Sequence, residues 1–223
     1  MASVADVCNM ALAHLGARTQ VNSISPPDGS AEAGYCARFY PVARKELIET
    51  GAWAFTRRRV QLTEVDNVSN VWQYAYAEPA GMVNALRVLN QRYLMAIGAS
   101  WPLMYEPGSL MNWALVDELF KERGSSEFDI ENGIIYTNEP EAWFLYTQDV
   151  TDTTKFSPMF TSALGMLLAS YLAGPIIKGL EGAQVGARWR DAAMSLSARA
   201  EASDANSTNQ RADHVAAHIR GRL

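Results

Sequence analysis

Residues 4–55 read VADVCNMALAHLGARTQVNSISPPDGSAEAGYCARFYPVARKELIETGAWAF, and this stretch indicates two helices followed by an aromatic segment. In its first part, apolar residues recur at the spacing of one helix face, at Val4, Val7, Cys8, Ala11, Leu12 and Leu15. The pattern predicts an amphipathic helix that ends at Gly16, because glycine readily takes the left-handed backbone conformation that closes many helices.

A second, longer helix is expected to begin at Ser30 or Asp28, since both residue types cap helix N-termini. Its inward positions keep the helical period, at Ala33, Cys36, Ala37, Tyr40, Leu47 and Ile48. Pro41 predicts a bend, because proline removes a backbone donor and crowds the preceding turn. Trp53 and Phe55 follow the helix, where large aromatic side chains usually fill the space between elements.

The order of these parts closely resembles the N-terminal signature of phage head-to-tail adaptors, the tail tubular protein A family of short-tailed phages. That signature places Asn-x-Ala-Leu-x-x-Leu-Gly before an Ile-Ser turn, then a helix with tyrosine and arginine, then Trp-x-Phe. The matching positions, called the signature residues below, are Asn9, Leu12, Gly16, Tyr40, Arg44, Trp53 and Phe55. The resemblance covers about residues 1–62, 72–89 and 128–205.

Composition is compatible with this resemblance and excludes some classes of function. A chain of 223 residues is long enough for one substantial core or two small ones. Its net charge of −5 argues against a general nucleic-acid binder held by phosphates. Cys8 and Cys36 are expected to be buried free thiols. With no basic leader and no uncharged apolar segment of about 18 residues identified, we expect a cytosolic protein that does not bind membranes.

After Arg59 the apolar period shortens towards two, which is typical of strands. Strands are predicted at residues 60–63, 72–76, 85–89, 128–130, 134–136 and 142–148. The Asn132-Gly133 pair predicts a tight hairpin, because Asn-Gly suits the turn that joins two twisted strands. Residues 57–150 therefore predict a mainly antiparallel β domain, in which the loop-rich segment 90–125 is a candidate contact surface.

The C-terminal part returns to helical patterns. Ser157 is a good N-cap, and residues 159–172 are apolar on nearly every side. Gly174-Pro175 predicts the end of this helix, and a last helix is expected over about 176–202. The predicted fold is thus α+β, with a helical bundle built from residues 1–56 and 151–203, an inserted β domain at 57–150, and an extended C-terminal tail at 204–223.

The resemblance implies that the C-terminal tail docks on the portal ring. Its candidate portal-binding residues are Arg211, His214, His218, Arg220 and Arg222. His214 and His218 also have metal-ligand spacing, but no third ligand accompanies them, so a solvated tail is the better interpretation. A polar terminus of this kind is usually disordered until it binds its partner.

Arg57, Arg58 and Arg59 form the one strongly basic cluster identified in the sequence. They are candidates for contact with DNA in a channel or with acidic residues of a neighbouring subunit. The ordinary alternative is a solvated strand whose arginines pair with local carboxylates. Each of these interpretations is compatible with the sequence.

No catalytic motif was identified in the chain. It lacks a nucleophile elbow, a zinc-protease helix and a phosphate-binding loop. The carboxylates around the predicted hairpin fit solvated turns better than a glycosidase pair, and they are Asp129, Glu131, Glu139 and Glu141. We therefore expect no enzyme activity, no cofactor and no metal site.

The resemblance implies a virion structural protein that forms a homo-oligomeric, dodecameric ring between the portal and the tail nozzle, a protein like tail tubular protein B. Tail fibres are further candidate partners, and the genomic DNA would pass through the ring during ejection. The expected location is the virion neck, after assembly from the host cytoplasm. Two alternatives are a neck or tail-completion protein of a long-tailed phage and a DNA-binding accessory factor.

Overall fold

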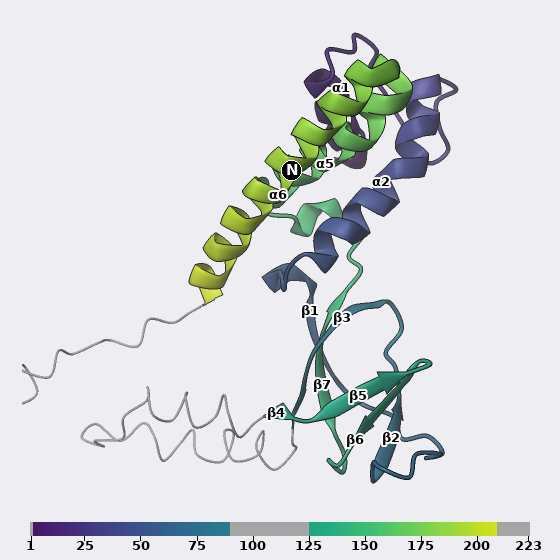
Figure 1. Cartoon of the computed structure of the whole chain (residues 1–223), viewed down its shortest axis with the longest axis vertical. Helices are drawn as coiled ribbons and strands as arrows, with labels where there is room; N and C mark the ends of the chain where they lie inside the picture. The colour runs from purple at the N-terminus through teal and green to yellow at the C-terminus, as the bar shows by residue number, and fades with distance from the viewer. Residues whose placement is uncertain (1, 90–124, 209–223) are drawn as a thin grey trace, which may run out of the picture. The chain divides into compact units, whose positions relative to one another are not determined.

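The computed structural model describes residues 2–89 and 125–208 (Figure 1). Over these residues it is a mixed α+β structure with four α-helices and two small antiparallel sheets. The chain divides into two compact units, which are described separately. The helical unit comprises Met1–Arg57 and Thr147–Asn206, and the β unit contains Arg58–Tyr146 as its main segment.

The first two helices begin and end at positions that the sequence predicts. Helix α1 spans Val4–His14, and the predicted stop at Gly16 is confirmed by its φ of 70°. Helix α2 spans Ala31–Glu49 and passes through Pro41 without interruption. Its N-cap is Ser30, whose hydroxyl oxygen accepts a hydrogen bond from the Ala33 amide at 3.1 Å.

Helix α5 spans Pro158–Ile177 and is the central element of the helical unit. Among its 20 residues only Pro158 and Gly174 are exposed, and it packs against α1 and α2. By length and composition α5 could cross a membrane. Half of the residues in its most apolar stretch are buried within the protein. The expectation that the chain has no uncharged apolar segment of this length was therefore wrong. Packing against other helices accounts for the apolar surface of α5.

The predicted boundary between the last two helices was also wrong. Helix α5 continues through Gly174-Pro175, because a proline in the last turn removes only one hydrogen bond of that helix. The chain reverses instead at Lys178 and Gly179, where φ is 64° and 63°. Helix α6 then spans Gly179–Thr208, so the first residues of the predicted tail continue this helix.

Two glycines of α6 allow its backbone to approach α5 closely. A methyl group on Gly182 would lie 2.9 Å from the carbonyl oxygen of Ala173, and one on Gly186 would lie 2.9 Å from that of Ser170. Carbon and oxygen atoms do not approach so closely without strain. The absence of a side chain at these two positions therefore sets the spacing of the two helices.

The β unit contains two sheets. The last two residues of strand β7, Thr147 and Gln148, belong to the helical unit. One sheet has the order β1-β7-β3-β4, with bounds Arg57–Gln61, Trp143–Gln148, Met82–Leu89 and Ser125–Ser126. The other has the order β2-β6-β5, with bounds Tyr74–Ala77, Ile134–Thr137 and Phe128–Glu131. The Asn132-Gly133 hairpin between β5 and β6 is confirmed, with φ of 50° and 78°.

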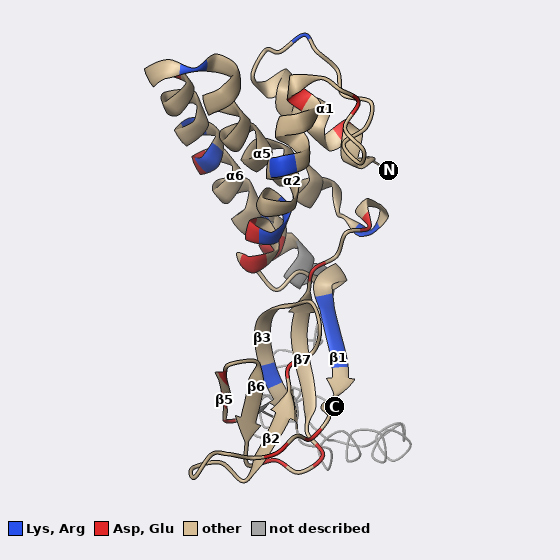
Figure 2. Ribbon diagram, turned by 90° about the vertical axis from the view of Figure 1, so that its right-hand side faces the viewer, with Lys and Arg blue, Asp and Glu red and all other residues tan. Residues whose placement is uncertain are grey.

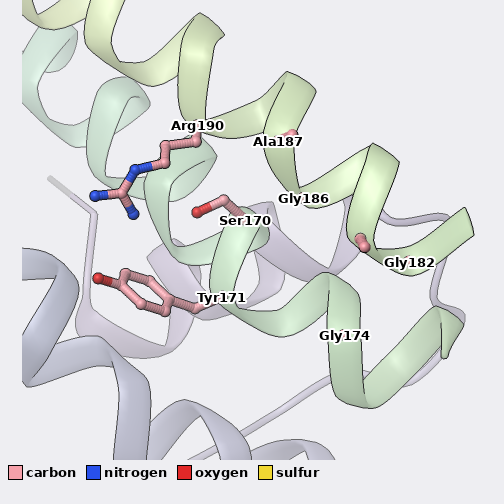
Figure 3. Close-up of a pocket in the computed structure, with 8 residues that line it drawn as sticks. Ser170, Tyr171, Gly174, Gly182, Gly186, Ala187 and Arg190 are labelled. Carbon is pink, nitrogen blue, oxygen red and sulfur yellow. The ribbon is translucent and has the colours of Figure 1, made fainter. Parts of the chain in front are cut away.

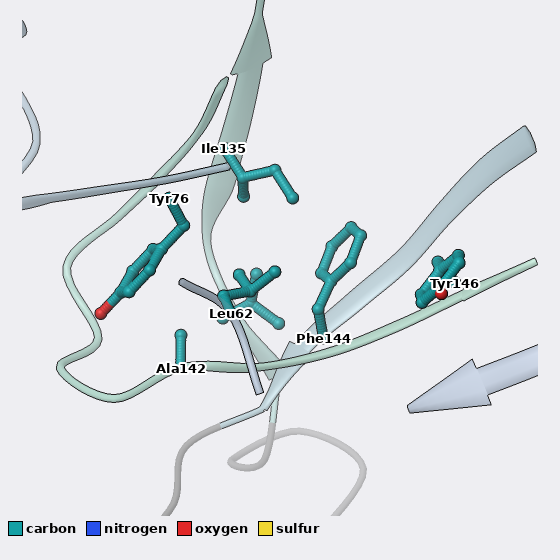
Figure 4. Close-up of a cluster of buried hydrophobic side chains, with 7 residues drawn as sticks. Leu62, Tyr76, Ile135, Ala142, Phe144 and Tyr146 are labelled. Atoms are coloured by element: carbon teal, nitrogen blue, oxygen red, sulfur yellow. The ribbon is translucent and has the colours of Figure 1, made fainter. Parts of the chain in front are cut away.

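The two sheets share one hydrophobic core (Figure 4). Its buried members come from both sheets and adjacent turns: Leu62, Tyr76, Val88, Ile135, Ala142, Phe144 and Tyr146. Strands β4 and β5 follow one another along the chain and join the sheets on one side. On another side, the Ala77 amide donates to the Thr63 carbonyl at 2.9 Å, so the chain after β1 pairs with β2. These links reduce the length of unpaired sheet edge.

Two short 3₁₀ helices complete the helical unit. Helix η1 spans Ala54–Thr56 directly before β1, and η2 spans Thr153–Lys155 directly before α5. The side chain of Asp152 accepts a hydrogen bond from the Thr154 amide at 3.0 Å, which caps η2. These turns lie on the segments by which the chain leaves and re-enters the helical unit.

Replacing Gly186 by alanine is expected to lower the free energy of unfolding by about 1–3 kcal/mol, because the new methyl group meets the backbone of α5. Gly34 is the matched control, since it lies exposed in α2 and a methyl group added there would have no atom within 4 Å. At that position alanine should stabilise the protein by up to about 1 kcal/mol through helix propensity. Urea unfolding of both variants measures the difference, and equal stability of the two would contradict the close-approach argument.

Candidate functional site

The signature residues of the N-terminal segment all lie in the helical unit. Asn9 binds both backbone polar groups of Val21: its Oδ1 accepts from the Val21 amide at 2.7 Å, and its Nδ2 donates to the Val21 carbonyl at 2.9 Å. Val21 is only 1% exposed, so this side chain satisfies two buried backbone groups in a segment without regular structure. Leu12 is buried beside it on α1. Asn9 therefore fixes the chain that follows α1.

Arg44 forms a two-point ion pair with Asp149. Its Nε donates to Oδ1 at 2.9 Å and its Nη2 donates to Oδ2 at 2.8 Å. The side chains are 9% and 19% exposed, which makes the pair largely buried. Asp149 directly follows β7. The pair therefore holds α2 to the segment that re-enters the helical unit.

Tyr40 lies one helical turn before Arg44 and is 3% exposed. The Arg44 guanidinium carbon lies 5.8 Å from the centre of the Tyr40 ring. Within the described part of the chain, the Tyr40 hydroxyl has no hydrogen-bond partner. Burial raises the pKa of Tyr40 to about 12, so the phenol stays neutral near pH 7. Its position suits packing rather than proton transfer.

Trp53 and Phe55 pack against the start of α5. The Trp53 indole Nε1 donates to the Leu47 carbonyl at 2.9 Å, and its ring lies 5.0 Å from that of Phe160. The Phe55 ring lies 4.9 Å from Phe160 and 5.4 Å from Phe156. The end of the N-terminal segment is therefore fastened to the beginning of the C-terminal one.

A polar network links α2, α5 and α6. The Glu46 carboxylate accepts hydrogen bonds from Tyr171 and from Arg190, and Figure 3 shows the Arg190 side chain directed towards Tyr171. Burial and the hydrogen bond to Glu46 raise the pKa of Tyr171. The adjoining hollow of about 300 Å³ is lined largely by glycine and alanine. Because Glu46 is already engaged by two donors, the arrangement suits a link between helices.

The three arginines of the basic cluster do not form a single patch. They occupy successive positions of β1, so the side chain of Arg58 points to the opposite face of the strand from those of Arg57 and Arg59. The Arg57 Nε donates to the Ala52 carbonyl at 2.9 Å, while Arg59 is exposed. Figure 2 shows these residues in blue on β1. Only part of the cluster is therefore presented to any one partner.

The candidate portal-binding residues Arg211, His214, His218, Arg220 and Arg222 lie outside the described residues, and so does most of the loop-rich segment 90–125. Among residues 2–89 and 125–208, no group of three His, Cys, Asp or Glu side chains is placed to hold a metal ion. The hairpin carboxylates Asp129, Glu131 and Glu141 are exposed, and the half-buried Glu139 accepts a hydrogen bond from Ser126 at 2.6 Å.

Two other titratable side chains of the helical unit, Cys8 and Cys36, are buried, and a third, His14, is half-buried. Cys8 and Cys36 are free thiols with no solvent exposure, as predicted, and a hydrogen bond to Cys36 together with burial raises the pKa of Cys8. The His14 ring lies 4.3 Å from the Trp189 ring, which joins α1 to α6. Burial lowers the pKa of His14, and its Nε2 has no partner within the described structure.

Sequence reasoning missed an exposed apolar pair in the β unit. Val68 and Val71 lie between β1 and β2 and are 78% and 79% exposed. Their neighbours are mostly polar, which made the segment resemble an ordinary turn-rich connection. The available signal was the recurrence of valine in a segment that does not continue a strand pattern.

No protein-family model and no curated protein matches the chain. The resemblance to phage adaptors is therefore argued from the signature residues. In this structure Asn9 and Arg44 form hydrogen bonds or ion pairs, and Tyr40, Trp53 and Phe55 pack against other side chains. Leu12 is buried, and Gly16 ends α1.

Replacing Arg44 by methionine should lower the free energy of unfolding by about 3 kcal/mol or more, since the largely buried Asp149 carboxylate would lose its two-point partner. Lys45 provides the matched control. Its Nζ lies 4.0 Å from the same carboxylate, but its side chain is 62% exposed, so methionine there should change stability by less than about 1 kcal/mol. Chemical denaturation compares the two variants; similar losses would show that the paired geometry is unimportant.

The His14 environment predicts that stability falls as the pH is lowered. Because burial lowers the pKa of His14 in the folded state, the unfolded chain binds a proton more readily, and stability is lost as the pH drops below the ordinary histidine pKa of about 6.5. In the His14→Leu variant the loss between pH 7.5 and 5.5 should be smaller than in the unmodified protein. Urea unfolding at both pH values tests this, and parallel losses would exclude His14 as the titrating group.

Proposed function

We propose that this protein is a head-to-tail adaptor, a structural protein of the virion neck that forms a dodecameric ring between the portal and the tail nozzle and provides a conduit for DNA. In this proposal the helices form one bundle from both ends of the chain, the β domain is inserted between them, and the C-terminal tail extends to the portal. Before assembly the protein resides in the host cytoplasm.

The observation that carries the proposal is the role of the signature residues. Five of them form polar or aromatic links, and four of these links join residues from the two halves of the helical unit: Arg44–Asp149, Trp53–Phe160, Phe55–Phe156 and Phe55–Phe160. Their side chains serve packing, which agrees with a protein that acts through rigid interfaces. A ring of identical subunits needs a rigid subunit, because each subunit must present two complementary surfaces at a fixed angle.

The charge of the β unit also supports a conduit rather than a DNA-binding factor. Its described residues include eight Asp and Glu against three arginines, Arg58, Arg59 and Arg87. Tight binding to duplex DNA requires many cationic contacts with phosphates. A surface with an excess of carboxylates would let DNA pass without holding it.

The test is to mix the purified full-length chain with the portal ring encoded in the same genome and to image the mixture by electron microscopy, with each component alone as a control. A second ring stacked on the portal is expected. A chain that ends at Thr208 should bind the portal far more weakly while keeping its circular dichroism spectrum, because it lacks the candidate portal-binding residues.

An unchanged portal, with the full-length chain still dispersed, would contradict the proposal. In that case, binding of the chain to duplex DNA that weakens steeply with salt would favour the accessory-factor alternative. Stacking by the shortened chain as strong as that of the full-length chain would keep the adaptor function and remove the tail from the portal contact.

A further inference from the structure

The segment of residues 62–73, called the β1–β2 loop below, exposes an apolar surface. Val68 and Val71 are each more than three-quarters exposed, and they lie three positions apart. Single exposed apolar residues are ordinary on protein surfaces. Two such residues on one short loop are more informative if the loop holds them in a defined position, because a defined apolar surface can match a partner.

The β1–β2 loop is ordered by its own side chains. The Asn67 Nδ2 donates to the Trp72 carbonyl at 2.7 Å, and the Asn67 Oδ1 accepts from the Ser69 amide at 2.9 Å. The Ser69 hydroxyl oxygen accepts from the amides of Val71 and Trp72 at 3.2 and 3.3 Å. These bonds form on both sides of Val68 and Val71. The two valines are therefore held in place before a partner binds. Binding would then carry only a small entropic cost for ordering the loop.

The end of the loop lies at a hollow that suits a cationic side chain. Trp72 lines this hollow of about 530 Å³ together with Phe128, Glu127 and Asp129. Both of these carboxylates are exposed. Aromatic ring faces attract arginine and lysine, and carboxylates pair with them. The hollow therefore favours a basic group.

The charge around the β1–β2 loop is negative, like that of the hollow. Glu64 and Asp66 are exposed on the loop itself, and Figure 2 shows acidic residues along the loops of the β unit, whereas the basic residues in the described part of this unit lie on β1 and β3. A second copy of this surface would be repelled, because like charges would meet around the valines. Charge complementarity thus selects a partner that is basic.

We propose that the β1–β2 loop and the adjoining hollow form a docking surface for a second protein, one that presents lysine or arginine side chains around an apolar pocket. Val68 and Val71 enter the pocket, and the basic side chains contact Asp66, Glu127 and Asp129. The identity of the partner rests on the proposed function: for an adaptor it is the tail nozzle protein, whereas the tail residues 209–223 serve the portal.

The experiment immobilises the purified nozzle protein from the same genome and titrates it with the full-length chain, without portal. Val68→Ser combined with Val71→Ser should weaken binding at least tenfold, which corresponds to about 1.4 kcal/mol. Leu180→Ser is the matched control, since Leu180 is 76% exposed on α6 and should leave nozzle binding unchanged. Loading of every variant on the portal ring is measured in parallel as a check on folding and on the adaptor function.

A charge variant tests the basic character of the partner. Asp66→Asn combined with Glu127→Gln should slow association at low salt and have little effect at high salt, because salt screens exposed charges. If the valine variant binds the nozzle as tightly as the unmodified chain, or if the unmodified chain does not bind it, the docking proposal is overturned. Failure of the unmodified chain to load on the portal ring would instead count against the proposed function.

Self-association is the remaining alternative for the valines. Sedimentation velocity of the unmodified chain and of the valine variant distinguishes it from nozzle binding. An equal mass for both proteins is expected. A lower mass for the variant, with unchanged nozzle binding, would assign the surface to a second copy of the chain and overturn the proposal.

Discussion

The helical unit depends on covering α5. This helix carries no charged residue, and almost every position along its length is at least half-buried. Exposing such a helix to water would cost roughly 25 cal/mol for each Å² of apolar surface. It therefore needs partners on several sides, and α1, α2 and α6 supply them. The requirement explains why helices from both ends of the chain come together.

Polar contacts then fix which surfaces meet, since burial of apolar area is not directional. Asn9 holds the segment after α1, Arg44 holds the return from β7, and Glu46 connects α2 to the other two helices. Close approach at Gly182 and Gly186 sets the spacing of α6. Each contact involves only a few atoms, but together they restrict how the four helices can be arranged.

Much of this structure could be predicted from local sequence patterns. Ser30 and Ser157 cap helices, Gly16 ends one, and Asn132-Gly133 forms the hairpin, because each effect depends on a few neighbouring residues. The end of α5 was misplaced, since the proline in Gly174-Pro175 is tolerated in the last turn of a helix. Contacts between distant residues were not predictable: Arg44 and Asp149 are 105 positions apart, and no local pattern pairs them. The exposed valines were missed for a different reason, because exposure on a loop leaves no periodic signal.

The discontinuous helical unit also imposes an order on synthesis at the ribosome. Residues Arg58–Tyr146 of the β unit have all been added before residues 147–206 are made. Helices α1 and α2 are made first, yet the helix that covers their apolar faces begins only at Pro158. At a synthesis rate of roughly 5–20 residues per second, several seconds pass between the synthesis of these two helices and that of α5. During that interval α5 does not yet cover their apolar faces, and transiently exposed apolar surface of this kind makes a nascent chain prone to aggregation.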